Sequence, residues 1–191
     1  MTFEKFKTET KKEEKKQEEK KRIPEIRTIE SENVEIKKLY LEDSEDAMKL
    51  LMLNGFEVTK KEVEHIVKDN LSFGAYVGRQ LVGVGLGWAA CFDIKKVIIV
   101  DGIPNSIYLE DVVLSLAFEG TGIRSMLLKS REQEGLIRKF QYSIAYISED
   151  LPMGELEDYI KERGKKLTQM YMLEKYQFFE TKHGILAVKV F

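Results

Sequence analysis

The chain has 191 residues, which suits one well-packed domain, and 43% of them are hydrophobic, as in a typical globular protein. Its formal net charge is only −2, so no bulk electrostatic field favours nucleic acid or an anionic membrane, and we expect neither as a partner. The charge is unevenly spread: residues 1–22 carry nine Lys or Arg and six Asp or Glu, which leaves the rest of the chain at −5. This acidic body favours a cationic small substrate over a polyanion.

Cysteine and histidine usage argues against two kinds of site. The single cysteine, Cys91, allows no disulfide within the chain, which favours a reducing cytoplasm. It lies in an apolar run without a neighbouring His, so we expect an inert buried thiol rather than a nucleophile. His65 and His183 are isolated, so no metal site is predicted.

Hydropathy and composition complete the broad classification. No segment has the apolar core of a signal peptide or the length of a membrane span, so we expect a cytoplasmic protein. Lys and Glu are abundant whereas Asn is scarce, a bias that is typical of heat-adapted proteins.

The N-terminal part of the chain predicts a tail followed by the start of a domain. Residues 1–22 offer almost no apolar side chain beyond Phe3 and Phe6, so we expect residues 1–27 to form a charged tail, either disordered or a solvated helix. The domain, 28–191, should start with a strand at 33–41 and a helix from about Ser44. A second helix should begin after Thr59, because a glutamate three residues on completes a capping box.

The middle of the chain predicts an antiparallel meander. Residues 73–77 and 81–92 alternate in hydropathy and are joined by a tight turn. Gly83, Gly85 and Gly87 fall on one face of the second strand, which indicates that something packs unusually close to its backbone.

The second half predicts a strand–helix–strand unit. Strands are expected at 106–115, 140–148 and 184–191, a helix at 123–135, and further helix at 153–176 with a break at Gly164. The unit at 106–148 should form a crossover between parallel strands, with a ligand crevice at the carboxyl end of its first strand. The residues from Glu110 onward lie at that point.

A glycine turn opens the helix of this unit and is a candidate phosphate site. Backbone N–H groups at a helix start lack partners and carry a partial positive charge, and glycine lets an anion approach closely. Gly120 and Gly122 form the turn, and the donors would be the N–H groups of Ile123, Arg124 and Ser125. A connection that needs glycine only for its backbone geometry explains the same residues, so both interpretations stand.

The stretch IYLEDVVLSLAFEGTGIRSMLL, residues 107–128, resembles the Gcn5-related N-acetyltransferases (GNATs), and its YLED segment is most similar to the diamine and polyamine N-acetyltransferases. The resemblance implies an α/β fold with a mixed, mostly antiparallel central sheet, flanking helices and one parallel β-α-β crossover. It also implies acetyl-CoA as cofactor, with backbone groups of Val112, Val113 and Leu114 on the pantetheine arm and the acetyl carbonyl. The pyrophosphate would be wrapped by the loop residues Glu119, Gly120, Thr121, Gly122, Ile123, Arg124 and Ser125.

Two residues of this loop depart from the family pattern. Glu119 stands where the family has Gln or Arg, so its negative charge would face the pyrophosphate and weaken binding. Arg124 replaces a small residue, and it either supplies a compensating charge or blocks the closest approach.

The adjacent carboxylates supply the candidate proton chemistry. Acetylation needs a neutral amine, and the resemblance implies Glu110 as general base, with Asp111 and Tyr108 at the substrate. On a strand Tyr108, Glu110 and Leu114 share one face, which would place Glu110 near the acetyl position. The backbone N–H of Leu114 would stabilise the oxyanion. The alternative is that the carboxylates cap a sheet edge or pair with a lysine.

The tyrosine that often protonates the leaving thiolate in this family has no direct counterpart here. The matching position is Leu173. Tyr171 and Tyr176 are close in sequence, but a shift of this size rotates a helical side chain well away, so we expect both to pack in the core.

The sequence thus predicts an acetyl-CoA-dependent N-acetyltransferase that transfers an acetyl group directly to a small amine, a polyamine or a peptide amine. The alternative is a catalytically degenerate GNAT-fold binding module that still binds CoA. The resemblance also implies a homodimer formed through the C-terminal strands.

Overall fold

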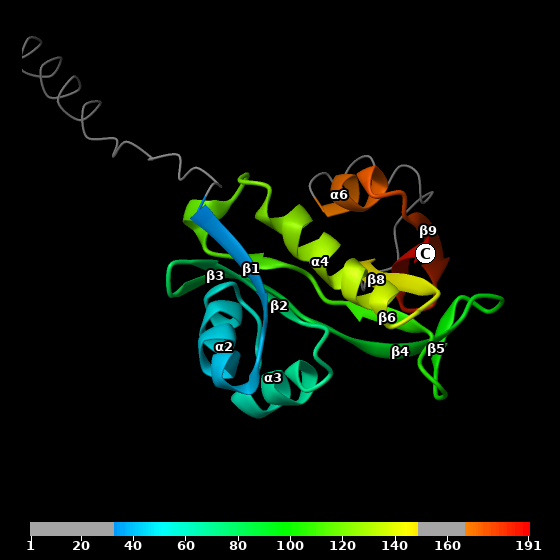
Figure 1. Cartoon of the computed structure of the whole chain (residues 1–191). Helices are drawn as coiled ribbons and strands as arrows, with labels where there is room; N and C mark the ends of the chain where they lie inside the picture. The colour runs from blue at the N-terminus through cyan, green and yellow to red at the C-terminus, as the bar shows by residue number, and fades with distance from the viewer. Residues whose placement is uncertain (1–32, 149–166) are drawn as a thin grey trace, which may run out of the picture.

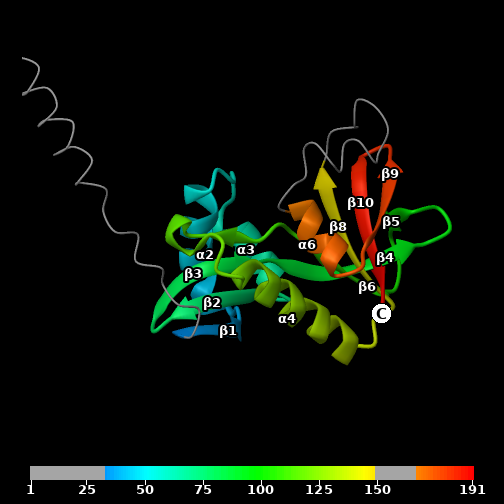
Figure 2. The same ribbon diagram turned by 90° about the horizontal axis from the view of Figure 1, so that it is seen from above.

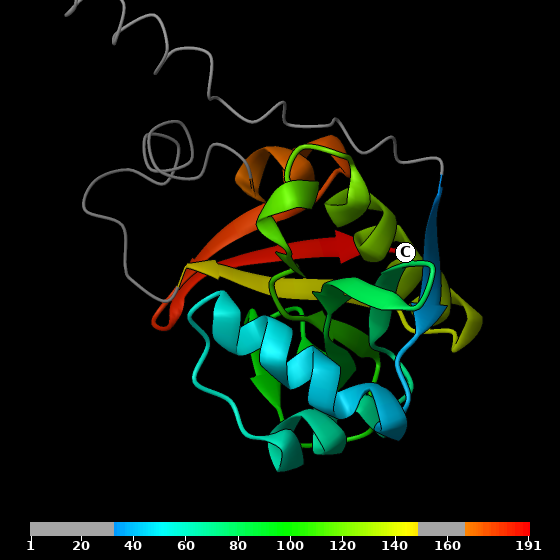
Figure 3. The ribbon, with the colours of Figure 1, turned by 90° about the vertical axis from the view of Figure 1, so that its left-hand side faces the viewer.

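The computed structural model describes residues 33–148 and 167–191 (Figure 1). The tail expected at 1–27 and the greater part of the expected helix, 153–166, lie outside the described residues. Two sheets run through the middle of the molecule, with helices on both sides (Figures 1 and 3). One side carries α2 (Ser44–Leu53) and α3 (Lys60–Val67), and the other α4 (Ile123–Ile137) and α6 (Leu167–Leu173).

The first sheet has four antiparallel strands in the order β1-β2-β3-β7. They are β1 (Val34–Lys38), β2 (Phe73–Val77), β3 (Gln80–Gly85) and β7 (Val113–Leu114). Buried Leu51 of α2 and Val63 of α3 pack with Val84 in one core cluster, because both helices present an apolar stripe to the sheet. The expected capping box is confirmed: the Glu62 N–H donates to Thr59 Oγ1 (3.3 Å), and the Thr59 N–H donates to Glu62 Oε2 (2.7 Å).

The second sheet has six strands in the order β5-β4-β6-β8-β10-β9. They are β4 (Gly87–Asp93), β5 (Ile98–Val100), β6 (Ser106–Leu109), β8 (Tyr142–Ser148), β9 (Gln177–Thr181) and β10 (Gly184–Val190). β6 and β8 are parallel and all other pairs are antiparallel, so the expected mixed fold with one parallel crossover is confirmed. The crossover helix α4 packs against strands of both sheets (Figure 2).

The expectation of two long strands, 81–92 and 106–115, was wrong. The first is interrupted at Leu86 between β3 and β4, and the second at residues 110–112 between β6 and β7. At each interruption the chain leaves one sheet and enters the other. Alternating hydropathy continues through such a bend, so it gives no sign of the break.

A buried arginine from α4 holds the two bends together. Arg131 is 0% exposed, and its Nη1 donates to the carbonyl oxygens of Leu86 (2.6 Å) and Glu110 (2.7 Å). A Cβ at Gly85 would lie 3.0 Å from Arg131 Nε, and one at Gly87 would lie 3.0 Å from the Leu71 carbonyl oxygen. The close approach that the glycines predicted is therefore the Arg131 guanidinium at Gly85, neighbouring backbone at Gly87 and the Leu114 side chain at Gly83.

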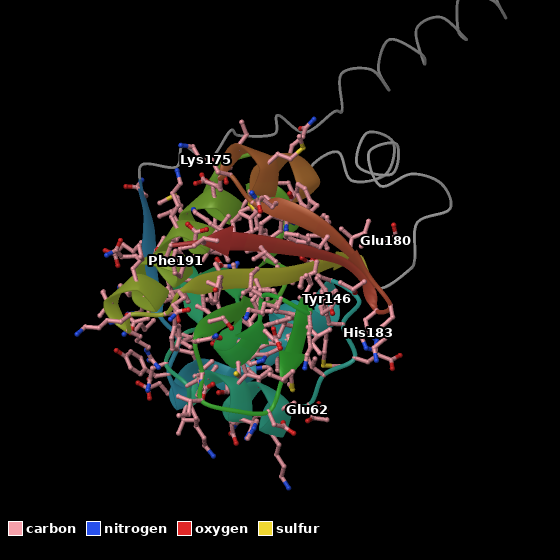
Figure 4. The ribbon with its side chains drawn as sticks, turned by 90° about the vertical axis from the view of Figure 1, so that its right-hand side faces the viewer. Glu62, Tyr146, Lys175, Glu180, His183 and Phe191 are labelled. Carbon is pink, nitrogen blue, oxygen red and sulfur yellow. The ribbon has the colours of Figure 1, made fainter. Side chains whose placement is uncertain are left out.

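The C-terminus contains a strand that the sequence analysis missed. β9 and β10 form an antiparallel hairpin, with the Thr181 hydroxyl donating to the Gly184 carbonyl across the turn (2.8 Å). Figure 4 shows the hairpin from His183 at its turn to Phe191 at its end. Cys91 is a free thiol on β4 and is only partly buried, against the expectation of a buried one.

Candidate functional site

The site begins where β6 parts from its parallel neighbour. β6 pairs with β8 only from Ser106 to Tyr108, and β7 then pairs with β3 of the other sheet. The backbone in between is fixed, because the Glu110 N–H donates to the Leu86 carbonyl (3.1 Å) and the Glu110 carbonyl accepts from the arginine described above. Residues 110–112 therefore lie at the divergence of two sheets, where backbone groups are released from strand pairing.

The edge of β7 that faces away from β3 is paired with no other strand among the described residues, and we call it the free edge. The Ser115 N–H donates to the Val82 carbonyl (2.9 Å), so Leu114 and Gly83 form a pair without mutual hydrogen bonds. The Leu114 N–H consequently points away from β3. The carbonyl of Val112, two residues earlier, faces the same way and accepts a hydrogen bond from Arg124 Nη1.

One cavity lies beside this stretch, and the carboxylate of Asp111 is part of its lining. Its volume is about 490 Å³, and its lining includes Asn54 and Phe56 after α2 as well as Asp111. Among the described residues the buried Asp111 Oδ1 has no hydrogen-bond partner. Burial raises the pKa of the Asp111 carboxyl, against the opposing charges of Arg131 and Arg124. Asp111 thus brings a carboxyl group to the cavity lining, with its Oδ1 buried away from solvent.

A second cavity, of about 330 Å³, lies at the start of α4. Gly120 (φ 79°) and Gly122 (φ 82°) line it, and no atom lies within 4 Å of where a Cβ would stand on either. The first N–H of the helix ladder is that of Met126, which donates to the Gly122 carbonyl (3.2 Å). The N–H groups of residues 123–125 precede it and form the partially positive end of a 15-residue helix.

Glu119 and Arg124 line both cavities. Arg124 Nη2 lies 2.6 Å from Glu119 Oε1, and Nε lies 3.4 Å from Oε2. The two residues that depart from the family pattern therefore form an ion pair, in which Arg124 balances the negative charge of Glu119.

The remaining loop residues have structural contacts. The Thr121 hydroxyl donates to the Phe118 carbonyl (2.6 Å) and closes the turn, and Ile123 is buried in a core cluster with Leu127. Ser125 lines the second cavity.

The two carboxylates lie at the strand interruption that follows Leu109. The Glu110 N–H donates to the Leu86 carbonyl and so continues the register of β6 with β4, whereas the carboxylate in the lining of the first cavity is that of Asp111. The interruption also means that Leu114 shares no strand face with Glu110. Tyr108 stacks on Trp88 of β4 with ring centroids 4.3 Å apart, and burial followed by the charge of Glu110 raises its pKa.

The three C-terminal candidates fall into two environments. Leu173 is 82% exposed and lines the second cavity, whereas Tyr171 is 1% exposed. The Tyr176 hydroxyl donates to Glu132 Oε1 (2.6 Å) in a buried network, and burial raises the pKa of both tyrosines. Both belong to the core cluster under α4, as ordinary packing predicts.

Sequence reasoning missed Arg131 altogether. Its signal was an arginine in the apolar stripe of α4, in helical spacing with Leu127 and Leu128, opposite the glycine-rich run that ends at Gly87. Over residues 33–148 and 167–191 no group of acidic, His or Cys side chains is arranged to hold a metal. No helix in these ranges is long and apolar enough to cross a membrane.

Comparison with known proteins identifies the fold. No protein-family model matches the chain, and no curated protein matches its sequence. Solved structures do: the loading GNATL domain of CurA from Lyngbya majuscula has a TM-score of 0.63 at 13% identity, covering 82% of this chain and 97% of that one. The PaiA N-acetyltransferase from Thermoplasma acidophilum in complex with coenzyme A has a TM-score of 0.58 at 14% identity, with coverages of 83% and 99%. The ribosomal-protein-alanine N-acetyltransferase from Brucella melitensis has a TM-score of 0.59 at 14% identity, with coverages of 82% and 99%.

Proposed function

We propose that this chain, which has the fold of the Gcn5-related N-acetyltransferases, is an acetyl-CoA-dependent N-acetyltransferase that passes an acetyl group directly to an amine. The observation that carries the proposal is the free edge of β7, which leads from the divergence of the two sheets to an open glycine turn and a helix start. Together these elements offer hydrogen-bond donors for an extended amide-containing arm and for a phosphate group.

The residues of these elements fit acetyl-CoA. The N–H groups of residues 123–125 would hold the pyrophosphate, and neither Gly120 nor Gly122 has an atom where a ligand would approach its Cα. Backbone groups of Val112 and Leu114 on the free edge would hold the pantetheine arm. The expected repulsion by Glu119 is reduced, because its carboxylate is paired with Arg124. When bound, acetyl-CoA supplies the acetyl group as a reactive thioester.

The chain's own residues would then orient the amine and move its proton. Asp111 would hold a cationic amine in the first cavity, because its carboxyl group is part of the cavity lining. Glu110 would take the proton that the amine loses, directly or through water. The Leu114 N–H would donate to the acetyl carbonyl oxygen as negative charge builds on it.

The acceptor that we favour is a small cationic amine. The buried acid in the cavity, the acidic body of the chain and the YLED segment that resembles the diamine and polyamine enzymes all support a polyamine-like substrate. The second candidate is a GNAT-fold module that binds CoA without transfer. Leu173, exposed in the second cavity where the family often has a tyrosine acid, favours it.

The test is cofactor binding followed by acceptor screening. Acetyl-CoA should raise the melting temperature of the chain, and Gly122→Val should abolish that rise, because a β-branched residue is strained at φ 82° and would fill part of the second cavity. Gly78→Val is the matched control, since Gly78 has φ 60° in the hairpin turn and likewise nothing near its Cβ position. A panel of polyamines, arylalkylamines and short peptides, read out by free thiol, then separates the enzyme from the binding module. No thermal shift at millimolar acetyl-CoA would reject both.

A further inference from the structure

The side chains of Glu119 and Arg124 form a partition between the two cavities. The first cavity extends from them towards Asp111 and Phe56, and the second towards Gly122 and α6. Among the described lining residues, these two are the ones that both cavities share. A ligand long enough to occupy both cavities must therefore pass the ion pair.

The partition also covers the free edge of β7. Arg124 is in the first turn of α4, and its guanidinium reaches across to the strand, where Nη1 donates to the Val112 carbonyl. That carbonyl is the acceptor on the free edge nearest the divergence of the sheets. In this conformation the arginine satisfies it, so a ligand amide must compete with Arg124 for it.

The ion pair is suited to opening. The Arg124 and Glu119 side chains are 34% and 33% exposed, and ion pairs with this much solvent contact are weak. A phosphate offers the same guanidinium more charge and a geometry that matches its planar fork, so it is the stronger partner.

We propose that Arg124 is a specificity residue with two positions, held in the first by Glu119 and the Val112 carbonyl and in the second by a phosphate of the ligand. The identity of the ligand as a CoA thioester rests on the function proposed above. When Arg124 turns to the phosphate, the two cavities join and the Val112 carbonyl becomes free for an amide of the same ligand. A pantetheine ligand that carries a phosphate thereby gains a contact with Arg124 and a contact with the Val112 carbonyl. Pantetheine without a phosphate must displace Arg124 and gives it no new partner.

Isothermal titration with CoA and with pantetheine tests this mechanism without an acceptor or turnover. Arg124→Gln should weaken CoA binding about 10- to 100-fold, the range for losing hydrogen bonds to a charged group. The same variant should leave pantetheine affinity unchanged or raise it, because the partition is gone. Glu119→Gln should tighten CoA binding about 2- to 5-fold, because the arginine no longer has to leave a carboxylate. High salt should weaken CoA binding more in the wild type than in Arg124→Gln.

Arg138→Gln is the matched control. Arg138 is at the other end of α4, roughly 21 Å along the helix, has a side chain 31% exposed, and pairs with Glu134 at 3.3 Å. Removing its charge should leave both affinities unchanged. If Arg124→Gln does not fold, Arg124→Lys, which keeps the charge but loses the fork, should lower the preference for CoA over pantetheine in the same direction.

The outcomes separate the two proposals. If the wild type binds CoA and Arg124→Gln weakens both ligands alike, or neither, the two-position mechanism is wrong while the proposed function stands. A wild type that binds no CoA at millimolar concentration overturns the proposed function, and the ligand assigned to Arg124 with it. A loss of CoA affinity in Glu119→Gln would overturn the role given to the ion pair.

Discussion

Replacing Asp111 by Asn should stabilise the fold while impairing function. The Asp111 carboxyl is buried, and one of its oxygens has no hydrogen-bond partner among the described residues. Leaving a buried polar group unsatisfied costs about 1–3 kcal/mol, and more when it is charged. The charges of Arg131 and Arg124 offset part of that cost. We therefore expect a gain of about 1 kcal/mol at neutral pH, or roughly 2–4 °C in Tm for a protein of this size.

The stabilisation expected for Asp111→Asn should increase as the pH rises from acid to neutral. Burial raises the pKa of Asp111 in the folded state above its ordinary value of 3.8, so the folded chain holds this proton more tightly than the unfolded chain. The loss of stability caused by the buried Asp111 charge is absent below pH 3.8, grows as the pH rises through the folded-state pKa, and stays constant above it. The difference in Tm between Asp111→Asn and the wild type should follow that course in melts at a series of pH values.

An exposed carboxylate supplies the control for this experiment. Asp101→Asn makes the same chemical change on the surface and should leave the Tm unchanged. A less stable Asp111→Asn at neutral pH, or a difference that does not vary with pH, would refute the reasoning. If the proposed substrate role holds, the stabilised variant should also show a higher KM for a cationic amine, because the position no longer carries a charge.

Three further predictions address catalysis, packing and the tail. Glu110→Gln should lower turnover by about two to four orders of magnitude while CoA affinity stays unchanged. The loss should shrink at high pH, where more of the amine is neutral. A variant that turns over as fast as the wild type throughout a pH series would rule out Glu110 as base. Arg131→Met should lower the free energy of unfolding in urea by about 2–4 kcal/mol, because the Glu110 carbonyl loses its donor and the Leu86 carbonyl loses one of its two donors. Equal urea midpoints for the variant and the wild type would show that the Arg131 hydrogen bonds contribute nothing to stability. Deleting residues 1–22 should leave both Tm and CoA affinity unchanged, since these residues offer no apolar face to dock, and a fall in Tm would show that the tail packs.

The elements that the sequence predicted well are those with local causes. The capping box at Thr59, the tight turn after β2 and the glycines before α4 depend on residues a few positions apart, and all three are present. The hairpin of β9 and β10 was missed at its first strand, because a short amphipathic segment directly after a helix has no clear period of its own.

The strand interruptions have a non-local cause and were not predictable in the same way. Arg131 reaches a carbonyl 45 residues earlier in the chain and another 21 residues earlier. The glycines at 85 and 87 indicated a close approach to the first segment, but nothing in either segment names the residue that approaches. The expected single face from Glu110 to Leu114 failed for this reason, because strand alternation was carried across the bend between β6 and β7. The pairing of Glu119 with Arg124 was missed for a related reason, since each residue was judged alone against a family pattern.

The Arg131 contacts tie formation of the ligand site to the closure of both sheets. A guanidinium that is 0% exposed has a stable position only when both sheets have closed around it. A partly folded chain with one sheet formed would therefore have neither bend in place and no divergence between β6 and β8 for a ligand to enter. Ligand binding then becomes a measure of complete folding, and a bound ligand should slow amide hydrogen exchange at Leu86 and Glu110 as well as in the loop that contacts it.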